Sequence, residues 1–140
     1  MKKENLFAVL LVFIFSFILN FVWENLHFPL YAGNSFGFNS HLALMLYASL
    51  VDAFFILLVF LFIGLINKKI NWKLNKKNLV LFSAFLISIS LLIEIRALIT
   101  GRWVYSSNMP TILGIGLSPL VQLALTGLIS IFSLKFANLQ

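Results

Sequence analysis

The sequence predicts an all-α integral membrane protein built as a four-helix bundle. Of its 140 residues, 61% are hydrophobic and only 10% are charged, and its mean hydropathy is +1.04. A soluble domain of this size needs far more polar residues to cover its surface. The hydrophobic residues form four long runs, each long enough to cross a hydrocarbon core of about 30 Å. We therefore expect a single transmembrane domain over residues 1–140.

The first two spans are expected at about residues 5–28 and 41–66, and the other two at about 79–99 and 111–134. A charged start followed by an apolar run is also typical of a signal peptide. No small-x-small cleavage site follows here, so we expect the first run to stay in the protein as a span. The connection between the first two spans is rich in turn-forming residues.

Basic residues predict the orientation of the bundle. Residues 67–78 contain five lysines and no acid, which is typical of a cytoplasmic loop. Eight of the ten Lys and Arg residues lie on this side, and only Arg96 and Arg102 lie on the other. We expect a multi-pass protein of the cell membrane with both termini cytoplasmic. The net charge of +6 then reflects topology, and no nucleic-acid partner is expected.

Helical spacing gives each expected span one polar stripe. The residues that carry chemistry are Asn20, Glu24 and His27 on the first span, His41 and Asp52 on the second, Glu94 on the third and Gln122 on the fourth. At a rise of 1.5 Å per residue, Asp52 and Gln122 lie at similar depths, roughly 15 and 18 Å below the outer ends of their spans. We expect these side chains to meet in the outer half of the bundle.

The candidate catalytic residues are the acids Glu24, Asp52 and Glu94, because carboxyl groups kept from water can transfer protons. Candidate substrate-binding residues are Trp23, His27, His41, Arg102, Trp103, Tyr105 and Gln122. No tight spacing such as His-Glu-x-x-His occurs, so neither a metal nor another cofactor is expected. Cysteine is absent, which excludes disulfides and thiolate chemistry.

Several structural alternatives stay open for these residues. Asp52 could bind Gln122 and Ser49 only to lock two helices together. Glu94 could pair with Arg102 or with a group on another span. The aromatic residues of the outer loops could serve as anchors at the membrane interface.

A proline in the expected fourth span also predicts local structure. Pro119 cannot donate to the carbonyl of Ile115, so we expect a kink there and a free backbone acceptor close to Gln122.

Two segments resemble a group of small, uncharacterised multi-pass membrane proteins. They are W-E-x(4)-P-L-Y from Trp23 and G-R-W-x-Y-x(3)-M-P from Gly101. This resemblance implies no activity. The run from Trp103 to Pro119 is also distantly similar to part of the heterodimeric-type lycopene cyclase domains, membrane enzymes that protonate a polyene. That family has acids just after the proline, where this chain has Leu120-Val121-Gln122.

The sequence thus predicts a polar cluster that binds a lipid-like or isoprenoid-like molecule, or acts on it by acid–base chemistry, with lateral entry from the bilayer. The alternative is a non-catalytic membrane subunit whose polar cluster only packs helices or a partner. A proton-linked carrier is less favoured because the inner half is poor in acids. Homo- and hetero-oligomers both stay open.

Overall fold

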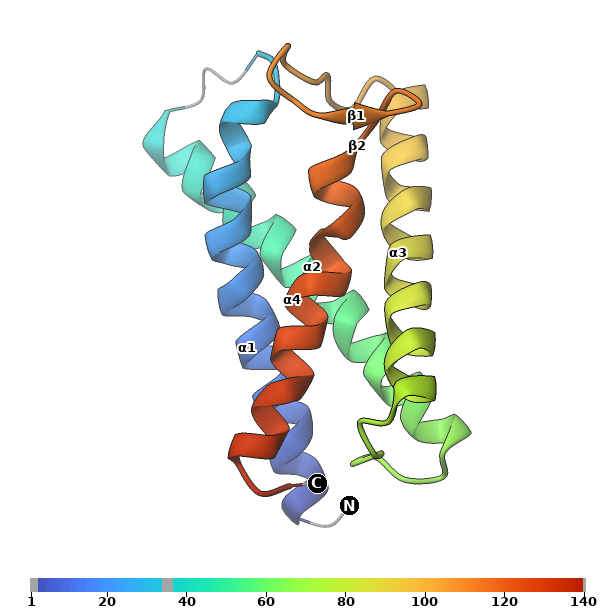
Figure 1. Cartoon of the computed structure of the whole chain (residues 1–140). Coiled ribbons are helices and arrows are strands. Elements are labelled where there is room, and N and C mark those ends of the chain that lie inside the picture. The colour runs from blue at the N-terminus through green and yellow to red at the C-terminus, as the bar shows by residue number, and fades with distance from the viewer. Residues whose placement is uncertain (1–2, 34–36, 140) are drawn as a thin grey trace.

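Four long helices make up most of the chain in the computed structural model, which describes residues 3–33 and 37–139. They are α1 (Lys3–His27), α2 (Phe38–Ile66), α3 (Lys76–Ile99) and α4 (Leu117–Phe136) (Figure 1). Each is long and apolar enough to cross a membrane. The predicted all-α bundle of four candidate membrane spans is confirmed.

Helix α1 packs against α2 and α4, and α4 also packs against α3. Helices α1, α4 and α3 run side by side, and α2 crosses behind them at an angle (Figure 1). The start of α1 and the end of α4 lie at the same end of the bundle. We call this the inner end, and we call the end formed by residues 28–33 and 100–116 the outer end. The side of the membrane that each end faces stays a prediction.

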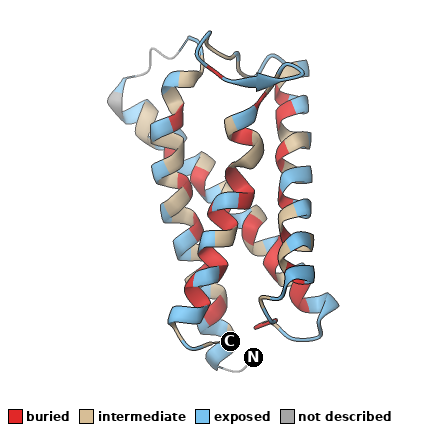
Figure 2. Cartoon of the chain, viewed as in Figure 1, coloured by how far each residue is buried: buried red, intermediate tan, exposed pale blue. Residues whose placement is uncertain are grey.

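Lipid-facing and packed residues are cleanly separated. The outward faces of the helices carry exposed Leu, Ile, Val and Phe side chains, whereas buried residues follow the helix contacts (Figure 2). In the inner half the buried side chains form one apolar core, which includes Phe60, Phe82, Ile131 and Leu134. Such a surface suits a hydrocarbon solvent and such a core suits close packing.

The loop between α2 and α3 folds back into this core. Trp72 is 1% exposed, its ring lies 5.7 Å from Phe60 and 5.9 Å from Phe82, and its indole N–H donates to the Phe60 carbonyl at 3.1 Å. The Asn75 side chain caps α3 by accepting from the Asn78 N–H at 2.9 Å. The lysine-rich loop therefore also contributes a buried side chain, Trp72, to the apolar core of the inner half.

The fourth span is shorter than predicted, and its expected start at residue 111 is wrong. Residues 111–116 instead form a hairpin of two short antiparallel strands, β1 (Thr111–Ile112) and β2 (Ile115–Gly116). The turn between them places Leu113 at φ 54° and Gly114 at φ 80°, values that no α-helix adopts. The other three helices begin two or three residues earlier than predicted.

The predicted kink at Pro119 is also wrong. Because α4 begins at Leu117, Pro119 lies in the first helical turn, where backbone N–H groups have no partner within the helix. Its missing donor therefore leaves no gap in the helix. The carbonyl of Ile115 belongs to β2 and not to an interrupted helix.

Candidate functional site

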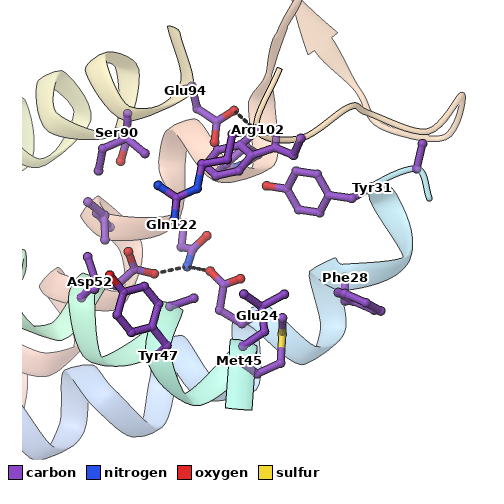
Figure 3. Close-up of a pocket in the computed structure, with 18 of the residues that line it drawn as sticks. Glu24, Phe28, Tyr31, Met45, Tyr47, Asp52, Ser90, Glu94, Arg102 and Gln122 are labelled. Atoms are coloured by element: carbon purple, nitrogen blue, oxygen red, sulfur yellow. Dashed lines mark hydrogen bonds between the residues drawn. The ribbon is translucent and has the colours of Figure 1, made fainter. Parts of the chain in front are cut away.

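The side-chain amide of Gln122 joins three helices at the centre of the candidate site. Its nitrogen lies 2.6 Å from Glu24 Oε1, 2.8 Å from Asp52 Oδ2 and 3.2 Å from Asn20 Oδ1 (Figure 3). An amide nitrogen has two hydrogens, and the two shorter contacts are to the acids. The predicted meeting of Asp52 with Gln122 is therefore present, and Glu24 joins it. Ser49 does not, because its hydroxyl donates to the carbonyl of Met45.

A layer of fixed polar groups lies beneath the two acids. Asn20 is fully buried and donates through Nδ2 to the Ser16 carbonyl at 2.8 Å. The Thr126 hydroxyl lies 3.2 Å from Asn20 Oδ1 and 2.9 Å from the Gln122 carbonyl. These contacts hold the side chains of Asn20 and Gln122 in place. The hydrogen-bonding groups beneath the two carboxyl groups are therefore fixed before any ligand binds.

Glu94 is held from the outer side. Its Oε2 accepts hydrogen bonds from the Tyr105 hydroxyl and from the indole N–H of Trp103, the latter at 3.4 Å. The same Tyr105 oxygen accepts from the Gly116 N–H at 3.0 Å. The partners of Glu94 are thus these two aromatic residues. The guanidinium of Arg102 instead lies over the ring of Trp103, 5.9 Å from its centroid.

A cavity of about 490 Å³ separates Glu94 from the Glu24 and Asp52 carboxyl groups. In Figure 3, Gln122 lies between Asp52 and Glu24, Glu94 lies across the pocket from them, and Arg102 reaches in from the rim. Three of the four acidic residues of the chain line this one space. The apolar walls include Leu44, Met45, Tyr47, Val51, Ile93 and Leu123.

The pocket reaches the lipid-facing surface of α2. Leu44 and Tyr47 line it, yet they are 41% and 59% exposed. Side chains that both line a cavity and lie on the outer surface mark a mouth. One mouth therefore lies among the exposed apolar residues of α2. The lining residues Ala32, Gly33 and Arg102 are also exposed, so the pocket opens toward the outer end as well.

The two outer segments cover the pocket together. Tyr31 and Tyr105 form an antiparallel bridge, flanked by hydrogen bonds from the Ala32 N–H to the Val104 carbonyl at 2.8 Å and from the Ser106 N–H to the Leu30 carbonyl at 2.9 Å. The Tyr31 ring lies 5.9 Å from the ring of Trp103. These residues build an aromatic cover above the acids.

The environment of this cover keeps both tyrosine hydroxyls protonated. Burial, followed by the nearby charge of Glu94, raises the pKa of Tyr31 well above its ordinary value. Burial, followed by the hydrogen bond to Glu94, raises the pKa of Tyr105 to about 12. Tyr105 therefore acts as a hydrogen-bond donor to Glu94 at neutral pH.

Four predicted site residues, Trp23, His27, His41 and Tyr105, do not line the pocket. His27 is 4% exposed and packs edge-on against Tyr31 at 5.1 Å, with no hydrogen-bond partner for either ring nitrogen. The Nε2 atom of His41 lies 3.2 Å from Asn25 Oδ1. Trp23 lies beside His27, with ring centroids 6.4 Å apart. Trp23 and His27 lie on α1 and His41 lies on α2, on faces that do not line the pocket. Tyr105 acts through Glu94.

Asn20 and Ser90 also belong to the site, although neither is among the candidate catalytic or binding residues. Asn20 contacts the amide of Gln122, and Ser90 lines the pocket one helical turn before Glu94. Each lies four residues before an acid of the site, Asn20 before Glu24 and Ser90 before Glu94. Helical spacing therefore places each of them on the same face as that acid and could have identified them. Among the described residues, no group of three His, Asp or Glu side chains is arranged to hold a metal ion.

Comparisons of the chain with models of known families, with curated proteins and with solved structures find no match. The geometry of the pocket is therefore the basis for a functional assignment.

Proposed function

We propose that this protein binds a lipid-like, amphiphilic molecule in the outer pocket and acts on it by acid–base chemistry. The observation that supports this most strongly is the convergence of Glu24 and Asp52 on one Gln122 amide, at the floor of a cavity with a mouth on the lipid-facing surface. An acid pair, a cavity and lateral access are the parts that such a reaction needs.

The acid pair is suited to proton transfer. Two carboxyl groups that share one donor lie too close for both to be ionised in a bundle of low polarity. In our proposal Glu24 and Asp52 hold one proton between them and exchange it with the bound molecule. Gln122 orients the pair, and Glu94 faces the opposite side of the same molecule.

The walls and mouth of the pocket favour a lipid-like molecule. A chain entering past Leu44 and Tyr47 would stay in contact with apolar side chains along its whole path. The volume of about 490 Å³ lies within the range of roughly 300 to 1,000 Å³ that is typical of small-molecule sites.

Two measurements on purified protein test this proposal. Mass spectrometry of the extracted lipid should find a defined molecule with the wild type and lose it with Ala48→Phe, which fills the pocket. The matched control Ala43→Phe lies on the exposed face of the same helix and should retain the molecule. Incubation in D₂O should then place deuterium on a carbon atom of the molecule with the wild type but not with Asp52→Asn. Equal extracts from all three proteins would overturn the proposal.

A second candidate function is a non-catalytic subunit, favoured by the way Gln122 ties α1, α2 and α4 together. Hydrogen bonds between membrane helices contribute about 0.6 kcal/mol each on average. If the cluster serves only packing, Asp52→Asn should change neither the extracted molecules nor the fold, because an asparagine oxygen still accepts from Gln122.

A further inference from the structure

We infer that the molecule held in the pocket has a cationic ammonium head group, bound between the Glu24 and Asp52 pair and Glu94, with the Ser90 hydroxyl as a fixed contact. This inference rests on the proposed function and adds the chemical class of the ligand. It follows from the charge of the pocket, from an unpartnered buried hydroxyl and from the shape of the space.

The pocket has the opposite charge to the rest of the protein. The chain has ten basic and four acidic residues, and three of the four acids line this cavity. Among the described residues, Arg102 is the one basic side chain in the lining, and it reaches in from the exposed outer rim. With one proton shared by Glu24 and Asp52, the three acids carry two negative charges against the single positive charge of Arg102, so one further positive charge balances the pocket. An ammonium group is the head group that such a pocket stabilises.

The buried Ser90 hydroxyl is an independent observation that supports a ligand in this pocket. It lies on α3 one turn before Glu94, is 4% exposed and lines the pocket, and its Oγ has no hydrogen-bond partner. Several hydroxyls in the spans donate to a carbonyl of the preceding turn, as Ser88 does to Ala84 at 2.8 Å. The buried Ser16 hydroxyl also has no partner, but of the two only Ser90 lines the pocket. A buried hydroxyl without a partner is unfavourable. An ammonium N–H donating to Ser90 Oγ removes that cost.

The same arrangement disfavours an anionic head group. A phosphate between Glu94 and the Glu24 and Asp52 pair would meet three acids and a single guanidinium, and like charges at short range repel strongly where water is scarce. An ammonium head group is also compact, so its single chain can leave along the apolar wall past Tyr47.

The test compares three amphiphiles with the same chain: dodecylamine, dodecanol and dodecyl phosphate. Their binding to purified wild-type protein is measured at neutral pH in a neutral maltoside detergent, with Ala48→Phe as the filled-pocket reference. Dodecylamine should bind about tenfold more tightly than dodecanol, as expected for one charge-assisted hydrogen-bonded contact. Dodecyl phosphate should bind the wild type no better than it binds Ala48→Phe.

Two variants identify the contacts. Glu94→Gln should remove most of the preference for the amine, and Ser90→Ala should weaken amine binding severalfold. The matched control is Ser88→Ala, because that hydroxyl is exposed and bonded to its own helix. Its affinity for dodecylamine should equal that of the wild type.

The outcomes separate this inference from the proposed function. If dodecanol or dodecyl phosphate binds as tightly as dodecylamine and Ala48→Phe blocks the binding, the ammonium assignment fails while the pocket stands. If none of the three binds the wild type better than Ala48→Phe, the proposed function fails and the inference fails with it.

Discussion

The outer and inner halves of the bundle use polar residues in opposite ways. In the inner half, buried hydroxyls are satisfied within α4, as Ser130 donates to the Thr126 carbonyl at 2.7 Å and Ser133 to the Ser130 carbonyl at 2.6 Å. In the outer half, acids and amides from α1, α2 and α4 meet at Gln122 beside a cavity. Locally satisfied groups allow close packing, whereas groups that need partners on other helices make a site.

Packing shows the same contrast. Trp72, Phe60 and Phe82 are each no more than 1% exposed and close the inner half around one apolar core. The outer half instead leaves about 490 Å³ open between the four helices. We therefore expect changes in the inner half to alter stability, and changes in the outer pocket to alter ligand binding with little loss of stability.

The largest effect is expected for Trp72→Ala. The variant loses a buried indole and its hydrogen bond to Phe60, which should lower the free energy of unfolding by about 3 to 5 kcal/mol. Unfolding in detergent, followed by circular dichroism, measures this loss. The neighbouring exposed residue provides the control, and Lys73→Ala should change stability by no more than about 0.5 kcal/mol. A small loss for Trp72→Ala would mean that the inner core does not depend on the loop.

Gly127→Ala tests how tightly α3 and α4 pack. A methyl group at this position would lie 2.8 Å from Leu86 Cδ1 and 3.1 Å from Phe82 Cε1, so the core must shift. We expect a loss of about 1 to 3 kcal/mol in thermal or denaturant unfolding. Gly37→Ala is the control, because a methyl group there meets no atom within 4 Å. Equal melting temperatures for the two variants would contradict close packing.

Tyr105→Phe tests the aromatic cover between the two regions. It removes the donor to Glu94 and the acceptor for the Gly116 N–H, and it should lower stability by about 0.5 to 1.5 kcal/mol. Ligand binding should weaken as well, because Glu94 loses the group that positions it. Unchanged stability and affinity would show that the cover contributes nothing to the site.

The same tyrosine predicts a pH dependence at the alkaline end. Its pKa is raised from 10.0 to about 12 in the folded protein, so between these values the folded state binds more protons than the unfolded state. Stability due to Tyr105 is then complete below pH 10 and falls as the pH rises toward about 12. Unfolding of the wild type and of Tyr105→Phe at several alkaline pH values should show a steeper fall in the wild type, because the raised pKa of Tyr31 contributes to both proteins.

The smallest effect on stability is expected for Asp52→Asn. The asparagine oxygen can still accept from Gln122, so the free energy of unfolding should change by no more than about 0.5 kcal/mol. Proton exchange into the bound molecule should nevertheless be lost, because an amide cannot replace the acid. A folded variant that carries the same molecules and exchanges protons as the wild type does would favour the packing role instead.

Helical periodicity predicted the parts of the molecule that depend on single helices. The four hydrophobic runs predicted the four helices. The similar depths of Asp52 and Gln122 predicted their contact, in which Gln122 Nε2 lies 2.8 Å from Asp52 Oδ2. The spacing of Asn20 and Glu24 likewise predicted one face toward the bundle. Such features need only the rise and the turn of a helix, which hold wherever the chain is helical.

Features that depend on the path of the loops were missed. Residues 111–116 are apolar enough to extend the fourth run, and only the backbone of Leu113 and Gly114 shows the turn. Trp72 looks like part of a charged loop, and its burial depends on a chain reversal after α2. Glu94 binds Tyr105 because the two outer segments pair, a contact that no periodicity contains.

The measurement that tests the account most directly is native mass spectrometry of the detergent-extracted wild type beside Ala48→Phe and Ala43→Phe. We predict one bound molecule of defined mass on the wild type and on Ala43→Phe, and none on Ala48→Phe. Bare protein in all three spectra, or the same bound mass in all three, would contradict the claim that the acids of the outer half surround a binding site.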